Sequence, residues 1–323
     1  MEPASELTPE LRAFVEFVAK KGRELYRDLP WRRTYDPYAI WISEVMLQQT
    51  QVSRVDGRWQ RWLERFPTVD ALAAAAPSDV LEEWQGLGYN RRALSVHRAA
   101  QVISEAGGVF PQDPKELVKL PGIGPATAAG ICAFAFNLHG VYLETNVRTV
   151  FLHELYPQAE GVPDSELVPL VELTCPASVE DAGNADGTAG ADTAVDTAAN
   201  AADADSTEND ATAELTPRSW YYALLDYGAY LKKTIPNPSR RSKSHVKQSR
   251  FEGSHRQKRA ELLRVLLAHK DEGGAVFETL HQELCQIEVN AGRETLDEQV
   301  TLGLLEELAK EGFCQKNDEY WLP

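Results

Sequence analysis

Residues 120–136 read LPGIGPATAAGICAFAF, and this stretch decides the fold. Pro121 fixes one backbone angle, while Gly122 and Gly124 permit positive φ, so the first five residues predict a tight hairpin. From Ala126 onwards the sequence opens a helix whose first N–H groups point outward and form a ready anion site. The stretch therefore predicts a backbone clamp for a phosphate group. Taken alone, an ordinary helix–helix connection is the alternative.

Helical periodicity extends outward from the hairpin in both directions. Apolar residues recur at helical spacing in 11–18 and again in 40–52, and prolines separate the segments at positions 67, 77, 111 and 114. Residues from about 8 to 173 contain no alternating strand pattern of useful length, so we expect this region to be all-α. The helical pattern returns at Arg218–Leu231.

Charge is distributed very unevenly along the 323 residues. Ten acidic side chains and no Lys or Arg lie between Pro176 and Glu214, in a stretch with almost no large apolar residues. Such a composition cannot bury enough surface to order itself, so we expect a disordered acidic insertion at 176–216 within one domain, 1–231. Residues 232–259 hold ten basic side chains and one acid, which makes them a candidate phosphate-contact strip or, alternatively, a solvated linker.

The C-terminal part follows a basic linker at 232–255. Helical patterns occupy about 256–269, 276–287 and 295–310, and FCQKNDEYWLP at 313–323 is able to form a hairpin. Three helices and a terminal hairpin predict a winged-helix-like α/β domain at 256–323. A small helical appendage that only packs on the first domain is the alternative.

The sequence also bears on where in the cell the protein is located. The N-terminus lacks the basic and apolar segments of a signal peptide, and no apolar stretch is long enough for a membrane span, so we expect a cytoplasmic, nucleoid-associated protein and no membrane partner. The four cysteines (Cys132, Cys175, Cys285 and Cys314) form no CxxC pair, which argues against disulfides, zinc and iron–sulfur sites.

Four further motifs join the hairpin: LPWRRTYDPYAIWISEVMLQQTQV at 29–52, RFPTVDALAAAAPSDVLEEWQGLGYNRRALSVHRAA at 65–100, LETNVRTV at 143–150 and WYYALLDYGAYL at 220–231. Together they resemble the helix-hairpin-helix DNA glycosylases, and most closely the MutY-type adenine glycosylases. The resemblance covers most of residues 8–231 apart from the insertion. It implies an all-α, two-lobed helix-hairpin-helix fold in front of the small C-terminal appendage.

The resemblance implies a pair of catalytic carboxylates. Glu44 matches the general acid that protonates the leaving purine and then helps to activate water, which requires an apolar surrounding that raises its pKa. Glu144 takes the place of an Asp that stabilises the oxocarbenium-like sugar; the charge is kept, but the side chain is one methylene longer. Asn146 is the expected orienting neighbour of Glu144.

The same motifs imply contacts with DNA. Gln49 matches the wedge that fills the gap left by a flipped base, and Tyr89 matches the aromatic residue beside the opposite base. Further expected substrate- and DNA-binding residues are Trp31, Arg32, Leu47, Gln48, Gly122, Gly124 and Ala126. Ala126 stands where bifunctional relatives carry a Schiff-base Lys, so the resemblance implies a monofunctional enzyme.

The chain departs from the family after Leu231. MutY enzymes usually hold an iron–sulfur cluster on four cysteines there, but this segment has none, so we expect no cluster. We expect the basic strip to take over its phosphate contacts through Arg240, Arg241, Lys243 and Lys247. Besides the cluster, the family implies a bound monovalent cation. Its expected ligands are the main-chain carbonyls of Val118, Leu120 and Ile123. The C-terminal region is too short and too helical for the family's Nudix-like reader of 8-oxoguanine.

The sequence thus predicts a monofunctional DNA glycosylase that removes adenine mispaired with 8-oxoguanine or guanine. Its expected partner is double-stranded DNA that contains a mispaired or damaged base, and we expect a monomer. Two alternatives remain open: a thymine or uracil mismatch glycosylase of the same superfamily, and a non-catalytic DNA-binding protein with a glycosylase fold. The Glu in SEVMLQQTQV favours purine chemistry over the first, and the two carboxylates argue against the second.

Overall fold

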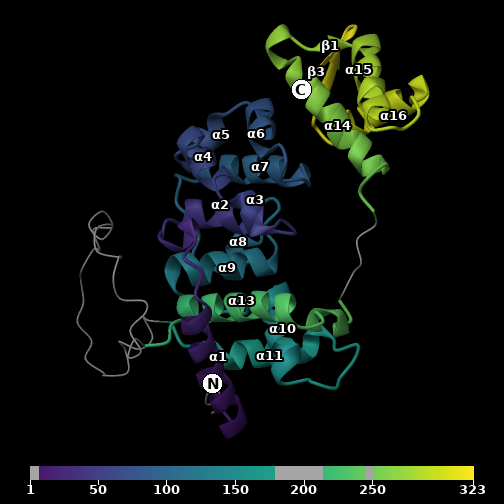
Figure 1. Ribbon diagram of the computed structural model, residues 1–323. Coiled ribbons are helices and arrows are strands. Elements are labelled where there is room, and N and C mark those ends of the chain that lie inside the picture. Colours follow the sequence, from purple (N-terminus) through teal and green to yellow (C-terminus); the bar gives the residue numbers. More distant parts are fainter. Residues whose placement is uncertain (1–6, 179–213, 245–249) are drawn as a thin grey trace. The chain divides into compact units, whose positions relative to one another are not determined.

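The computed structural model (Figure 1) describes residues 7–178, 214–244 and 250–323. The chain forms two compact units that each draw on separate stretches of sequence. Unit 1 comprises residues 1–44, 110–119 and 123–246, and unit 2 comprises residues 45–109, 120–122 and 247–323. None of the helices within the described part of the chain is both long and apolar enough to cross a membrane.

The regular elements of unit 1, as far as the structure describes this unit, are all helices. Its elements are α1 (Pro9–Leu25), η1 (Pro30–Arg32), most of α2 (Pro37–Leu47), α8 (Pro114–Leu117), α9 (Pro125–Phe136), α10 (Thr145–Glu154), α11 (Asp164–Thr174), α13 (Pro217–Thr234) and η2 (Pro238–Arg241).

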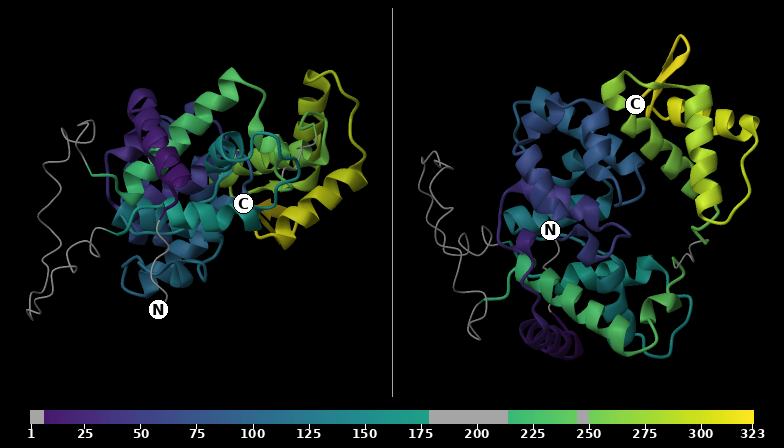
Figure 2. Two further views of the ribbon diagram at one scale, coloured as in Figure 1. Left: turned by 90° about the horizontal axis from the view of Figure 1, so that it is seen from below. Right: turned by 45° about the horizontal axis from the view of Figure 1, so that its top comes forward.

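Helix α13 is the centre of the unit 1 core. It begins where the Thr216 hydroxyl accepts a hydrogen bond from the Ser219 N–H, and Pro217 occupies its first turn, a combination that favours a helix start. Its apolar face buries Trp220 and Leu224 completely, and it packs along both α1 and α10 (Figure 2). Gly22 lets α1 approach closely, because a Cβ there would lie 2.2 Å from the Ala223 Cβ.

A buried ion pair fastens η1 to α13. The Arg32 guanidinium donates two hydrogen bonds to the Asp226 carboxylate, at 2.7 and 2.8 Å, and the two residues are only 3% and 2% exposed. The prediction that Arg32 binds DNA is therefore wrong, because its guanidinium is committed to the interior of unit 1. A planar, bidentate pair of this kind holds two segments in one geometry.

The hairpin forms as predicted. Gly122 has φ 76°, and a Cβ there would lie 2.5 Å from the Ser95 Cβ, so the position requires glycine for both conformation and space. Gly124 instead caps α9 with an ordinary φ of −88° and has open space around it. Positive φ, which both glycines permit, is therefore adopted at Gly122 and not at Gly124.

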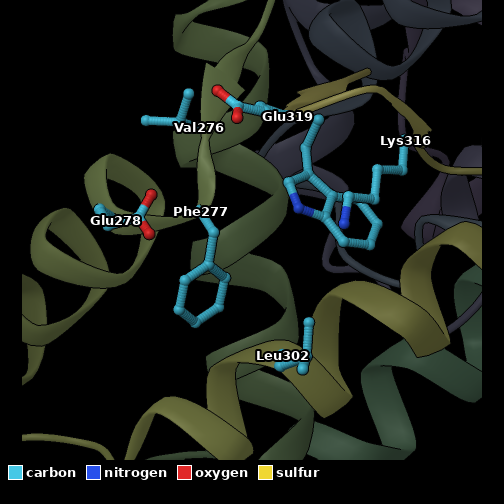
Figure 3. A pocket seen from close by; sticks show the side chains of 7 residues that line it. Val276, Phe277, Glu278, Leu302, Lys316 and Glu319 are labelled. Carbon is cyan, nitrogen blue, oxygen red and sulfur yellow. The ribbon is translucent and has the colours of Figure 1, made fainter.

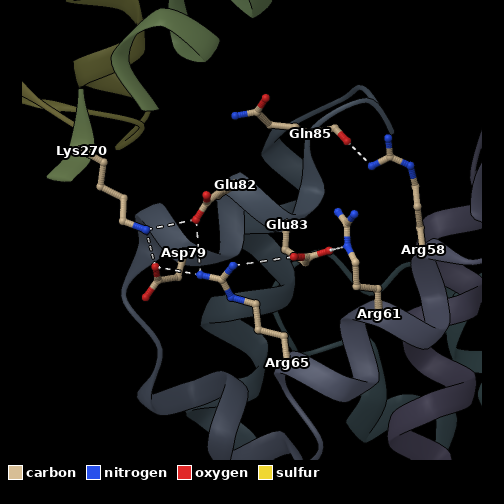
Figure 4. Close-up of polar contacts among 8 residues, drawn as sticks. All are labelled: Arg58, Arg61, Arg65, Asp79, Glu82, Glu83, Gln85 and Lys270. Carbon is tan, nitrogen blue, oxygen red and sulfur yellow. Dashed lines mark hydrogen bonds and ion pairs between the residues drawn. The ribbon is translucent and has the colours of Figure 1, made fainter. Parts of the chain in front are cut away.

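The first part of unit 2 is a compact group of helices: α3 (Val52–Val55), α4 (Arg58–Arg65), α5 (Val69–Ala74), α6 (Pro77–Trp84) and α7 (Arg91–Glu105). Trp62 and Trp84 are fully buried and meet edge to face, with ring centroids 5.5 Å apart. Charged side chains link the surfaces of these helices, and Lys270 donates to Asp79 and Glu82 in the same network (Figure 4). These pairs are partly exposed, so each adds little stability.

The second part of unit 2 confirms the winged-helix-like prediction. Its elements are α14 (His255–Ala268), η3 (Lys270–Glu272), β1 (Ala275–Val276), α15 (Phe277–Asn290), α16 (Glu298–Lys310), β2 (Gln315–Asn317) and β3 (Tyr320–Leu322). The strands form an antiparallel sheet in the order β1-β3-β2, in which Ala275 pairs with Trp321. The two-residue strand β1 was not predicted, since so short a strand leaves no periodic pattern.

The ends of the predicted acidic insertion are ordered parts of unit 1. The Ser178 hydroxyl accepts a hydrogen bond from the His139 N–H, and Thr216 caps α13, so the predicted limits of 176 and 216 are too wide. Residues 179–213 lie outside the described residues. The first part of the predicted linker is also structured, because α13 continues to Thr234 and Ser242 pairs with Val162.

Candidate active site

Glu44 lies on α2 and is half-buried, between Ser43 and Val45, which are buried. The Tyr142 hydroxyl donates a 2.8 Å hydrogen bond to Glu44 Oε2. Burial raises the pKa of Glu44 from 4.5 to about 7, and the nearby Glu144 carboxylate adds to this, while Tyr142 and Arg32 oppose it. At neutral pH, Glu44 is thus poised to donate or accept a proton.

Space for this carboxyl group comes from a glycine inside a helix. A Cβ at Gly130 of α9 would lie 2.6 Å from Glu44 Oε2 and 2.9 Å from Tyr142 Cε2. Gly130 interrupts an otherwise Ala-rich helical sequence, and an isolated glycine in a helix often marks a close approach. That signal was available in the sequence, whereas nothing in the local pattern singled out Tyr142.

Glu144, the second predicted carboxylate, caps α10. Its Oε1 accepts hydrogen bonds from the main-chain N–H groups of Asn146, at 2.5 Å, and Val147, at 3.1 Å. Burial raises the pKa of Glu144, and Lys232, these two N–H groups and Arg148 oppose the rise. The N-terminus of a helix also stabilises a negative charge, so the longer side chain still places a carboxylate at a site built for an anion.

Asn146 contacts its expected partner through the main chain. Its N–H donates to Glu144, and its side-chain oxygen accepts a 3.0 Å hydrogen bond from Lys232 Nζ. Unit 1 therefore brings together Glu44, Glu144 and Asn146, as well as Tyr142, which the sequence reasoning missed, and Lys232, which it assigned only to the basic strip.

Gln49 and Tyr89 both lie in unit 2, on loops with unusual backbones. Their φ angles are 54° and 51°, values that side-chain-bearing residues rarely adopt, and both residues are exposed. Local strain of this kind is often retained where function requires it. Leu47 and Gln48, just before the first loop, are half-buried, and Trp31 is buried in unit 1.

Arg92 connects these two loops. Its guanidinium donates to the carbonyls of Gln48, at 2.7 Å, and Gly88, at 3.1 Å, and lies 5.3 Å from the centre of the Tyr89 ring. Burial lowers the pKa of Arg92 to about 10, which still leaves it charged at neutral pH. Sequence reasoning missed this residue because the loops it joins are about 40 residues apart along the chain.

The predicted basic contacts divide into two groups. Arg240 and Lys243 are exposed, as phosphate contacts must be. Arg241 instead donates to the main-chain carbonyls of Leu152 and Tyr156, so its guanidinium fastens η2 to the end of α10 and is not free for phosphate. Lys247 lies outside the described residues.

Ala126 is half-buried in the first turn of α9, close to the hairpin that carries the carbonyls of Val118, Leu120 and Ile123. Within the described ranges, no three His, Cys, Asp or Glu side chains gather as a metal site would require. A hollow on the winged-helix part is lined by β1, α15, α16 and the terminal hairpin (Figure 3). None of the predicted site residues lines it.

Known proteins are similar to part of this sequence. The chain is 43% identical over 152 residues to an adenine DNA glycosylase of Mycolicibacterium smegmatis, which covers 46% of this chain and 52% of that protein. It is 40% identical over 134 residues to the adenine DNA glycosylase of Homo sapiens, covering 38% of this chain and 24% of that protein. The chain thus spans about half the length, or less, of these curated relatives.

A solved structure agrees in fold. A thermostable thymine-DNA glycosylase covers 71% of this chain and 90% of its own, with a TM-score of 0.53 at 20% identity, which is evidence for the fold alone. The family described as the HhH-GPD superfamily base excision DNA repair protein matches residues 42–219, more than half of the chain. This chain is therefore a member of the HhH-GPD superfamily of base excision DNA repair proteins.

Proposed function

We propose that the protein is a monofunctional DNA glycosylase that hydrolyses the N-glycosidic bond of adenine mispaired with 8-oxoguanine or guanine. The observation that carries the proposal is a pair of carboxylates in unit 1 with different surroundings. Burial raises the pKa of both groups, that of Glu44 to about 7, but Glu144 also faces Lys232 and accepts two main-chain hydrogen bonds, which favour its ionised form. When the environments of two carboxyl groups favour different protonation states, the group that holds its proton is assigned as the acid and the other as the ionised partner.

In the proposed reaction, Glu44 donates its proton to a ring nitrogen of adenine as the bond to the sugar breaks and its electron pair leaves with the base. Glu144 stabilises the positive charge that develops on the sugar. Glu44, now a carboxylate, accepts a proton from the water that adds to the sugar carbon. The products are free adenine and an abasic site, and Glu44 regains its proton.

The same proposal covers DNA binding. Gln49 would fill the gap left by the extruded base, and Tyr89 would stack beside the opposite base. The hairpin with Gly122 and Gly124 would hold a phosphate, with a monovalent cation on the carbonyls that precede α9. Ala126 offers no amine for a Schiff base, so strand cleavage by a covalent route is not expected. The protein would act on double-stranded DNA as a monomer, in the cytoplasm at the nucleoid.

The test is single-turnover cleavage of labelled duplexes containing A·8-oxoguanine, A·G, T·G or U·G, with alkali added afterwards to break abasic sites. We expect strand breaks at A·8-oxoguanine and A·G only after alkali, and none with Glu44→Gln. Cleavage at T·G or U·G with the adenine duplexes intact would instead identify a mismatch glycosylase. Binding without cleavage of any duplex would identify a DNA-binding protein.

A further inference from the structure

Helices α13 and α10 approach each other closely beside Glu144. A Cβ at Gly228 would lie 2.3 Å from the Asn146 carbonyl oxygen, so only glycine permits this approach. Lys232 is four residues further along α13 and therefore lies on the same face of that helix. Its Nζ donates to the Asn146 side-chain oxygen at 3.0 Å, so the ammonium group is held at the first turn of α10.

The charge of Lys232 acts on the carboxylate that caps this turn. Its positive charge is the largest influence that opposes the effect of burial on the pKa of Glu144, ahead of the two main-chain N–H groups. Arg148 also faces Glu144, but its guanidinium pairs with both oxygens of Asp164 at 2.9 Å, which offsets its charge.

The remaining groups act on Glu44, whose pKa is raised by the Glu144 carboxylate and lowered by the hydrogen bond from Tyr142 and by the charge of Arg32. Glu44 and Glu144 repel each other when both are ionised, and the Tyr142 hydroxyl is committed to Glu44. Two carboxyl groups that interact in this way share their protons, and a nearby cation decides which one remains charged. The hydrogen bond that Lys232 donates to the Asn146 side chain holds its charge closer to Glu144 than to Glu44 in the arrangement proposed here.

We propose that Lys232 is a positioning residue that keeps Glu144 ionised, so that the proton shared by the two carboxylates resides on Glu44. This inference rests on the proposed function, because glycosidic cleavage needs one protonated and one ionised carboxyl group. It also assigns the first residue of the basic strip to the active site rather than to DNA phosphate.

The experiment compares the intact chain with Lys232→Met and with Lys232→Arg, which keeps the charge. Single-turnover rates on the A·8-oxoguanine duplex are measured from pH 5 to 9. For Lys232→Met we expect the acidic limb of the profile to move up by about one pH unit, which lowers the rate about tenfold at pH values below the limb. Lys232→Arg should restore the limb, and Lys20→Met, which removes an exposed charge from α1, should leave it in place.

A second readout does not depend on activity. Carbon-13 NMR of protein with labelled glutamate, assigned with Glu144→Gln, follows the titration of Glu144 directly. Lys232→Met should raise its pKa further, and an unchanged titration would overturn the inference even if the melting temperature fell. A parent that titrates as expected but cleaves none of the four duplexes would instead refute the proposed function.

Discussion

Replacing Glu44 by Gln should stabilise the folded protein at alkaline pH while it removes the general acid. Burial raises the pKa of Glu44 from 4.5 to about 7, so the unfolded chain releases this proton at a lower pH than the folded protein. The contribution of Glu44 to the free energy of unfolding therefore falls as pH rises from 4.5 to 7 and is constant above. At about 1.4 kcal/mol per pH unit, the whole effect is about 3 kcal/mol, most of it between pH 5 and 8.

The assay is urea unfolding of the parent and of Glu44→Gln at pH 5 and pH 8. We expect the variant to gain about 2–3 kcal/mol relative to the parent between the two pH values. Glu64→Gln, which changes an exposed carboxylate on α4, is the matched control and should show no such gain. If Glu44→Gln differs from the parent by the same amount at both pH values, then burial does not hold the Glu44 proton and the acid assigned here is wrong.

Three further substitutions test other parts of the structure. Gly130→Ala should displace the Glu44 carboxyl group and lower the single-turnover rate about 100-fold with duplex binding unchanged, and an unaltered rate would contradict the packing described. Asp226→Asn leaves Arg32 buried without its counter-charge and should lower the free energy of unfolding by about 3–5 kcal/mol in urea; a loss below about 1 kcal/mol would show that the pair is not structural. Arg240→Gln should reduce the slope of log affinity against log salt by about one for any duplex, and the same slope would remove Arg240 from the DNA contacts.

Sequence alone predicted the elements that depend on local chemistry. The hairpin at 120–124 and the three C-terminal helices follow from glycine, proline and helical spacing within short windows, and the structure confirms them. The resemblance also singled out Glu44 and Glu144, because each lies inside a contiguous motif.

The sequence could not predict interactions between segments that lie far apart along the chain. Asn146 and Lys232 are 86 residues apart and Arg32 and Asp226 are 194 residues apart, with the acidic stretch between the members of each pair. From the sequence, a basic residue near a DNA-binding motif is interpreted as a phosphate contact. The burial of Arg32 and the hydrogen bonds of Arg241 to main-chain carbonyls show that these two residues serve the fold instead. One-dimensional patterns record the charge of a residue but not the group that it faces.

Arg92 has a consequence for how this protein tolerates change. One guanidinium holds both the Gln48 and the Gly88 carbonyls and lies against the Tyr89 ring, so the two strained loops share a support. Substitutions at Gln49 and Tyr89 should then show non-additive effects, because either one can release the loop that carries the other. The residue present in one loop therefore constrains which residues the other loop can accept. Among relatives, we expect Gln49, Tyr89 and Arg92 to be replaced together rather than one at a time.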